Sequence, residues 1–113
     1  MIKRCERLYI AGPYTNADPL LVDSNIEVAR DACAEAIRRN FIPFSPITMT
    51  AWFDEDYPDI AKESYLQLDI QWLLLCDSIF MLPGWENSQG AREELRIAQE
   101  MGMKVYYQWE DTV

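Results

Sequence analysis

Short apolar runs alternate with longer segments of helical periodicity, and this alternation limits the folds that the chain can adopt. The runs cover residues 8–11, 41–44, 78–82 and 104–107, and glycine or proline directly follows two of them. Apolar runs of this length between turn residues indicate buried strands. Strands that alternate with helices form a parallel sheet covered by helices on both faces. We therefore predict an α/β fold.

The segments between the runs have the spacing of amphipathic helices. We expect helices at about 24–39, 58–75 and 88–101, with Ser24 as the first N-cap and Gly102 ending the last helix. Their predicted inward stripes comprise Ile26, Ala29, Cys33, Ala36 and Ile37, then Leu66, Ile70, Leu73 and Leu74, and finally Ala91, Leu95, Ala98 and Met101. Residues 45–57 are expected to form a loop. The result is a small three-layer, Rossmann- or flavodoxin-like domain with about four strands, a single domain over residues 1–113.

The charge balance restricts the partners. Ten basic and nineteen acidic residues give a net charge of −9, whereas binding to nucleic acid requires a basic face. No stretch approaches the roughly 20 apolar residues that span a bilayer. No signal-peptide core follows the basic residues at the start. We therefore expect a cytoplasmic protein that has neither a nucleic acid nor a membrane as partner.

Few kinds of side chain are left to carry chemistry. The chain has no histidine, and its three cysteines lack C-x-x-C spacing, which argues against a zinc site and a histidine-assisted nucleophile. Residues 54–56 are acidic, but they lack the glycine turn and the later glutamate of a calcium loop. We expect no metal and no cofactor. Chemistry would then depend on carboxylates, hydroxyls, amides or arginine.

Two carboxylates occupy positions on the inward stripes of helices. Glu94 lies within the stripe of the third predicted helix, and Asp69 lies at i−4 from Leu73 on the second. An inward carboxylate needs a partner or a chemical purpose. A pair of them is suited to cleaving a glycosidic bond, because one attacks or stabilises the anomeric carbon while the other moves protons. The alternative is that each caps a loop or pairs with an arginine such as Arg30 or Arg92.

The loops after the strands supply candidate binding residues. In open α/β sheets the ligand binds beyond the carboxyl ends of the strands, where we expect the segments 12–14, 45–46 and 84–90. The last of these opens a helix, whose first N–H groups and positive dipole end suit an anion or a polar ligand. Trp85 would either stack on a ligand ring or cover the edge of the core. The candidate binding residues are Gly12, Pro13, Tyr14, Ser45, Trp85, Asn87, Ser88 and Gly90.

Three ordered motifs together span residues 8–107. They are Tyr9-Ile10-Ala11-Gly12-Pro13, then Asp69-Ile70-Gln71-Trp72-Leu73 with Cys76-Asp77, and Ser88-x-Gly90-x-x-x-Glu94-x-x-x-Ala98. This set resembles the nucleoside 2-deoxyribosyltransferase family and its nucleotide N-glycosidase relatives. The approach to the third motif, Pro83-Gly84-Trp85-Glu86-Asn87, is similar to that of a small bacterial and phage-borne branch of the family.

The resemblance implies roles for individual residues. Glu94 matches the nucleophile that attacks the anomeric carbon and displaces the base. Asp69 matches the acidic residue that assists the leaving base or holds a sugar hydroxyl. Tyr9 or Tyr14 would orient the Glu94 carboxylate through its phenol. No histidine is needed for such a reaction, in keeping with the composition.

The resemblance also implies a substrate. Ser88 and Gly90 match the loop that holds the 5′ side of the sugar, or a 5′-phosphate in the nucleotide-cleaving branch. The first loop lacks the glycine- and arginine-rich form of that branch. We expect an enzyme that cleaves or transfers at the N-glycosidic bond of a nucleoside, a deoxynucleoside or a nucleoside monophosphate. The alternatives are a non-catalytic module that binds a nucleotide or metabolite in the same pocket, and a structural scaffold.

Three further expectations concern aromatic and acidic residues. The aromatic content and the resemblance imply a homodimer or a higher homo-oligomer, with the region of Trp52 as the candidate contact. Trp72 is expected in the core between the second helix and the sheet. Asp77, which separates a helix from a strand, is expected to be a cap or turn residue.

Overall fold

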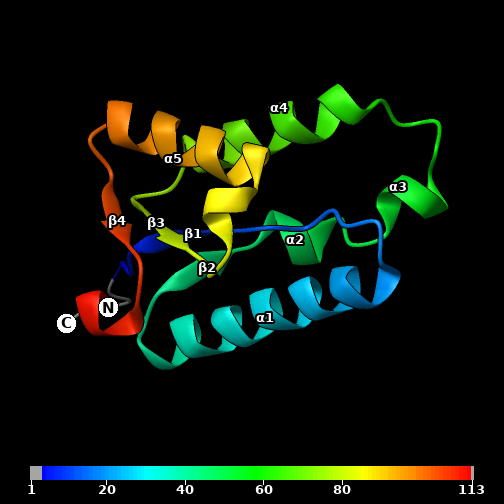
Figure 1. Cartoon of the computed structure of the whole chain (residues 1–113). Coiled ribbons are helices and arrows are strands. Elements are labelled where there is room, and N and C mark those ends of the chain that lie inside the picture. Colours follow the sequence, from blue (N-terminus) through cyan, green and yellow to red (C-terminus); the bar gives the residue numbers. More distant parts are fainter. Residues whose placement is uncertain (1–3, 113) are drawn as a thin grey trace.

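A parallel sheet of four strands forms the middle layer of the structure, a computed structural model that describes residues 4–112 (Figure 1). The strands are β1 (Arg7–Ala11), β2 (Ile42–Phe44), β3 (Ser78–Met81) and β4 (Lys104–Tyr106), in the spatial order β2-β1-β3-β4. Adjacent strands are parallel, and Tyr9 at the centre of β1 lies between Phe44 of β2 and Ile79 of β3. The predicted α/β fold is confirmed.

Helices cover both faces of the sheet (Figure 1). One face carries α1 (Pro19–Arg38) and α2 (Pro46–Met49), and the other carries α4 (Lys62–Leu73) and α5 (Gln89–Glu100). The remaining elements are α3 (Phe53–Asp56) and the 3₁₀ helices η1 (Trp85–Asn87) and η2 (Trp109–Thr112). Within residues 4–112, no helix has the length and apolarity needed to cross a membrane.

The sheet separates two apolar cores because side chains alternate along each strand. Leu8 and Ile10 of β1 face the α1 side, whereas Tyr9 and Ala11 face α4 and α5. The first core also contains Ala29, Ala32, Ala36, Ile47, Phe80 and Leu82, and the second contains Leu73, Ile79, Met81, Ala91, Leu95 and Ala98. The phenol of Tyr9 therefore enters the core between the sheet and the α4–α5 pair.

Two predicted helix starts are wrong, and local capping explains the first. Helix α1 begins at Pro19 rather than near Ser24, because the Asp18 side chain accepts the Leu20 N–H and proline occupies the first turn. Helix α4 begins later than predicted, at Lys62, and no side chain among residues 4–112 caps its start. The predicted loop 45–57 contains two short helices, the first of them capped by Ser45.

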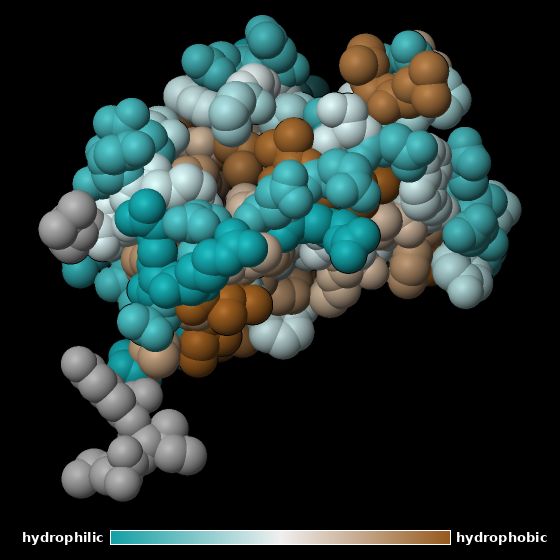
Figure 2. Space-filling view, turned by 90° about the horizontal axis from the view of Figure 1, so that it is seen from below, coloured by the Kyte–Doolittle hydropathy of each residue, from teal (hydrophilic) through white to brown (hydrophobic). Residues whose placement is uncertain are grey.

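Several residues predicted on inward stripes lie at the surface. Ile37, Leu66, Leu74 and Met101 are exposed, Ile37 to 63%. Helix α1 has 20 residues and is about 30 Å long at 1.5 Å per residue, whereas β2 and β4 have three residues each. The sheet is too short to cover the ends of the helices. In Figure 2, which looks at the α1 side, hydrophobic side chains accordingly reach the surface among hydrophilic ones.

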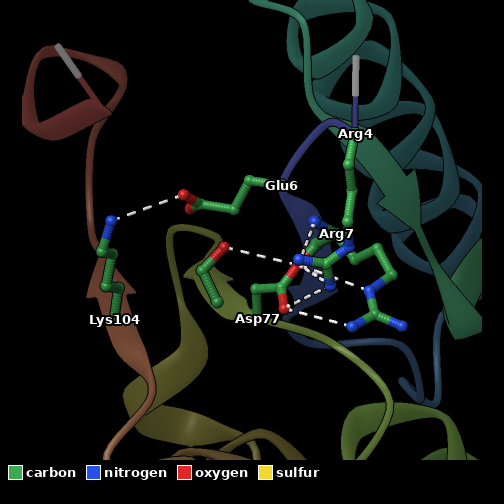
Figure 3. A network of polar contacts seen from close by, with 6 residues as sticks. Arg4, Glu6, Arg7, Asp77 and Lys104 are labelled. Carbon is green, nitrogen blue, oxygen red and sulfur yellow. Dashed lines mark hydrogen bonds and ion pairs between the residues drawn. The ribbon is translucent and has the colours of Figure 1, made fainter. Parts of the chain in front are cut away.

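A polar network joins the strands at their amino ends (Figure 3). Asp77 accepts the backbone N–H of Arg7 at 2.8 Å and also contacts the guanidinium groups of Arg4 and Arg7. These contacts, with the Arg7 side chain first, hold the pKa of Asp77 well below its ordinary value. Glu6 accepts the Tyr106 hydroxyl at 2.8 Å. Asp77 is the turn residue that the sequence predicts, and its network lies at the sheet edge opposite the carboxyl ends of the strands.

Candidate functional site

A buried hydrogen bond joins the sheet to α5. The Tyr9 hydroxyl of β1 donates to Oε2 of Glu94, which lies in the second turn of α5. Tyr9 is fully buried and Glu94 is 6% exposed. Alanine or leucine at 91, 95 and 98 fills the rest of the buried face of α5. The placement of Glu94 on the inward stripe is confirmed, and its partner is Tyr9.

Burial determines the protonation of Glu94. Loss of water raises the pKa of Glu94 to about 8, the Tyr9 hydrogen bond opposes this rise, and the charge of Asp69 adds to it. The pKa of Tyr9 is also well above its ordinary value, through burial and then the charge of Glu94. At neutral pH the carboxyl group of the free protein is therefore mostly protonated.

Asp69 completes a three-residue group at this place. It lies on α4, one turn before the buried Leu73, and is half-buried. Burial raises the pKa of Asp69 to about 6, and its charge acts on both Glu94 and Tyr9. Its Oδ1 atom is covered and has no hydrogen-bond partner within residues 4–112. The structure thus brings together the three residues predicted to be catalytic.

The arginines considered as partners of Glu94 lie elsewhere. Arg30 on α1 pairs with Glu27 at 3.8 Å, and both side chains are exposed. Arg92 is exposed on α5. In the described part of the chain Glu94 takes part in no ion pair. The alternative of a carboxylate neutralised by arginine is therefore not what the structure shows.

Aromatic rings extend from Tyr9 toward the surface along β2 and α4. The rings of Tyr9 and Phe44 lie 5.9 Å apart, and Phe44 stacks on Trp72 at 4.6 Å. Trp72 packs against the sheet as predicted, but it is 40% exposed and is not a core residue. The three rings form one apolar wall that begins at Tyr9, the partner of Glu94, and ends at the surface.

The loops after β1 and β3 pack against each other. A Cβ atom on Gly12 would lie 2.8 Å from Cβ of Leu82, so only glycine permits this approach. Gly84 has φ +89°, and its Cβ position lies 3.4 Å from Cγ of Pro13. Two of the three loops predicted to converge therefore do so. Gly12 and Pro13 shape this edge through their backbone.

Ser45 and Tyr14 have partners away from Glu94. The Ser45 hydroxyl caps α2 by accepting the Thr48 N–H at 3.3 Å, and it also lies beside the Cys33 thiol on the α1 side. The Tyr14 hydroxyl accepts the Trp52 N–H at 2.7 Å and donates to an Asp54 oxygen at 3.3 Å. Of the two tyrosines proposed to orient Glu94, only Tyr9 contacts it. Tyr14 instead holds the segment that contains α3.

The segment before α5 forms the last part of the edge. Ser88 is the N-cap, and its hydroxyl accepts the Ala91 N–H at 3.2 Å. The Cβ position of Gly90 faces open space, so no contact within the described residues requires glycine there. Asn87 is exposed. The Trp85 ring packs on the α4–α5 core and lies 5.9 Å from Tyr107, so it covers the core edge.

Tyr65 belongs to this edge, and the sequence pattern did not reveal it. Its ring is partly exposed, whereas its hydroxyl is covered and has no hydrogen-bond partner in the part of the chain that the structure describes. Tyr65, Asp69 and Leu73 follow one another at i and i+4 along the same face of α4. This spacing is the signal that could have identified Tyr65, one turn before Asp69.

Two surface hollows lie away from these carboxyl groups. One, of about 480 Å³, is lined by Ile26, Arg30, Cys33, Thr48 and Ala51 on the α1 side. The other, of about 420 Å³, is lined by Arg4, Cys5, Glu6, Asp77 and Lys104 at the amino ends of the strands. In the second, Asp77 and Glu6 are already paired with basic side chains. Neither hollow is lined by a buried carboxyl group together with a second carboxyl group that lacks a hydrogen-bond partner. The Tyr9–Asp69–Glu94 group has both and is therefore the better candidate.

Comparison with known proteins places the chain in a family. No curated protein matches it. A family model described as a domain of unknown function, DUF4406, matches residues 6–107. This range includes Tyr9, Asp69 and Glu94, together with all four strands. The chain belongs to the DUF4406 family.

Proposed function

We propose that this protein is an enzyme that breaks the N-glycosidic bond of a nucleoside or nucleotide, with Glu94 as nucleophile. The observation that carries the proposal is the buried Tyr9–Glu94 pair beside the half-buried Asp69. Two neighbouring acids with different pKa values are the equipment of glycosidic chemistry. Asp69 and Glu94 lie on helices whose N-terminal ends are at the carboxyl edge of the sheet, the edge at which α/β folds bind ligands.

The reaction has two halves in this proposal. A Glu94 oxygen attacks the anomeric carbon, the electron pair of the C–N bond leaves with the base, and an ester to the sugar forms. Asp69, whose pKa is about 6, is ionised in the pH range in which Glu94 attacks, so it relays a proton from water to the departing base. Water or a second base then attacks the same carbon and gives up a proton to the Asp69 carboxylate, and the electron pair of the C–O bond returns to Glu94. Tyr9 holds the carboxylate by donating its hydroxyl hydrogen.

The pKa of about 8 at Glu94 gives this mechanism a pH signature. Only the ionised carboxylate attacks carbon, so kcat/KM should rise through neutral pH and level off above about 8. A profile that rises near pH 6 and falls near pH 8 would instead assign Asp69 as the ionised group and Glu94 as the acid, and would overturn the proposed division of roles between the two carboxyl groups.

The direct test is release of free base. Wild-type protein is incubated with nucleosides, deoxynucleosides and their monophosphates, and the base is measured by chromatography. Glu94→Ala should reduce release by roughly three orders of magnitude. Glu93→Gln changes the neighbouring, surface-paired acid and should retain activity. Base release that survives Glu94→Ala would falsify the mechanism, and a wild type inactive on the whole panel would count against the enzyme.

The alternative function is a non-catalytic module that binds the same ligand class. It is favoured by the burial of Glu94, which raises the pKa of this carboxyl group and so favours its neutral form in the free protein. A neutral carboxyl group can donate a hydrogen bond to a ligand as well as accept one. Saturable binding of a nucleoside, measured by calorimetry without any release of base over hours, would establish this alternative.

Self-association and location remain predictions. A homodimer or a higher homo-oligomer would be detected by light scattering of the purified protein. Exposed Leu68, Trp72 and Leu75 at i, i+4 and i+7, on α4 and just after it, provide apolar surface for it. A cytoplasmic location, as expected for a nucleoside-metabolising enzyme, would be checked by fractionation of cells that express the protein.

A further inference from the structure

Helix α4 presents two unsatisfied polar groups on one face. The Tyr65 hydroxyl and Oδ1 of Asp69 are both covered, and neither has a hydrogen-bond partner within the described range 4–112. The two residues are one helical turn apart, so their Cβ atoms are about 6 Å apart. Covered polar groups in proteins are nearly always paired, and an unpaired one needs an explanation. Two such groups in adjacent turns indicate a place for a polar ligand.

The position of this pair relative to Glu94 follows from the direction of α4. The helix ends at Leu73, just before β3 begins, so its C-terminal end lies at the amino edge of the sheet and its N-terminal end lies toward the carboxyl edge. Leu73 packs in the core with Tyr9. Asp69 and then Tyr65 therefore continue from that core toward the edge where Glu94 and the loops meet.

The surroundings of Tyr65 favour a neutral ligand group over an anion. Asp54 of α3 and Asp59 both raise the pKa of Tyr65 through their charge, after burial. Asp54 also accepts the Tyr14 hydroxyl at 3.3 Å, so α3 lies near both Tyr14 and Tyr65. Three carboxylates with no arginine or lysine among these contacts would repel a phosphate. A hydroxyl group, in contrast, donates to a carboxylate and accepts from a phenol.

We propose that Tyr65 is a substrate-binding residue whose phenol, beside the Asp69 carboxyl group, holds the 2′- or the 3′-hydroxyl group of the sugar. The proposal rests on the proposed function, because the nucleoside is the source of the sugar. It adds a residue to the site and assigns the α4 face to the sugar. The aromatic wall formed by Phe44 and Trp72 is then left for the apolar part of the ligand.

The experiment measures binding, so that it does not depend on turnover. Glu94→Gln keeps the shape of the side chain and the acceptor for Tyr9 while removing the nucleophile. Calorimetry compares this variant with the double variant Glu94→Gln/Tyr65→Phe on a ribonucleoside, its 2′-deoxy analogue and its 3′-deoxy analogue. Glu94→Gln/Tyr57→Phe is the matched control, because Tyr57 is an exposed tyrosine of the preceding segment.

The expected result is that the effect of Tyr65→Phe on the dissociation constant depends on the presence of one sugar hydroxyl, which is the coupling between the two groups. Tyr65→Phe should weaken binding of the full nucleoside roughly five- to tenfold, the size of one hydrogen bond. The loss should fall to less than about twofold for the analogue that lacks the contacted hydroxyl. The analogue with the reduced loss identifies the 2′- or the 3′-hydroxyl. Tyr57→Phe should change no dissociation constant.

Two results would overturn the proposal. One is an equal effect of Tyr65→Phe on all three ligands, or no effect on any; the other is a complete lack of nucleoside binding by both the wild type and Glu94→Gln. Thermal unfolding of each variant shows whether it is folded. Failure of the proposed function has a different signature: the coupling would be present, but the wild type would release no base from the nucleoside that it binds.

Discussion

Glu94 is a buried carboxyl group whose titration connects function to stability. Its pKa is raised from an ordinary 4.5 to about 8, mainly by burial. Between these two values the unfolded chain is ionised while the folded protein keeps the proton. The folded state therefore loses stability as the pH rises from about 4.5 to about 8. Burial of Glu94 does not lower the free energy of unfolding below this pH window, and it lowers that free energy by the full amount above it.

Glu94→Gln should therefore stabilise the protein, and more so at high pH. We expect little change in the free energy of unfolding at pH 5 and a gain of about 2–4 kcal/mol at pH 8, measured by urea unfolding at both values. Glu93 is the control, because Arg96 lowers its pKa on the surface of the same helix. Glu93→Gln should give no gain at pH 8. An equal effect of Glu94→Gln at both pH values would contradict the raised pKa.

Tyr9 positions the Glu94 carboxylate and should also lower its pKa. The hydrogen bond from Tyr9 lowers the pKa of Glu94, in opposition to burial and Asp69. Tyr9→Phe removes the donor and should raise the Glu94 pKa further, which carbon-13 NMR of the labelled carboxyl group would measure. The rising limb of kcat/KM should move to higher pH together with that pKa, and activity at neutral pH should fall about 10- to 100-fold. A loss of activity with an unchanged pKa would leave Tyr9 a purely structural residue.

At the scale of elements, the start of α1 offers a test of capping. Asp18 accepts the Leu20 N–H at 3.0 Å, whereas Ser24 lies inside the helix. Asp18→Ala should lower the free energy of unfolding by about 1 kcal/mol, and Ser24→Ala should change it by much less. Thermal or urea unfolding measures both variants. A larger effect at Ser24 would mean that the helix starts where the sequence pattern predicts.

The strands were predicted more reliably than the helix ends, for a physical reason. Each strand is a short apolar run bounded by residues that break it, and the four runs coincide with β1 to β4 within a residue or so. Helix ends depend on which of several capping residues is used, and the chain offers both Asp18 and Ser24. The four-residue helices α2 and α3 have no periodicity that a sequence pattern can reveal.

The candidate site was predictable where it depends on helix faces and not where it depends on turns. Glu94 and Asp69 were found because each interrupts an inward stripe, whereas Tyr9 was suggested by the family resemblance of its strand motif. Ser45 and Tyr14 were placed at the site only by their position after a strand. Their hydroxyls instead serve α2 and the Trp52 segment, because polar groups in turns first satisfy nearby backbone groups.

At the scale of the whole molecule, the net charge of −9 should influence which ligands bind. Asp54, Asp59 and Asp69 lie on the segments around the candidate site, and the exposed Arg92 is a basic residue on the first turns of α5. The negative charge of these carboxylates should weaken binding of a ligand that carries a 5′-phosphate. We expect a nucleoside to bind more tightly than its monophosphate in dilute buffer, and the difference to shrink as sodium chloride rises from about 20 to 200 mM, because salt screens charges beyond about a Debye length. Calorimetry with the Glu94→Gln variant measures both dissociation constants. The contrary result is a monophosphate that binds more tightly than the nucleoside at low salt. It would show that Arg92 and the N–H groups at the start of α5 outweigh the carboxylates, as they would in a nucleotide-cleaving enzyme.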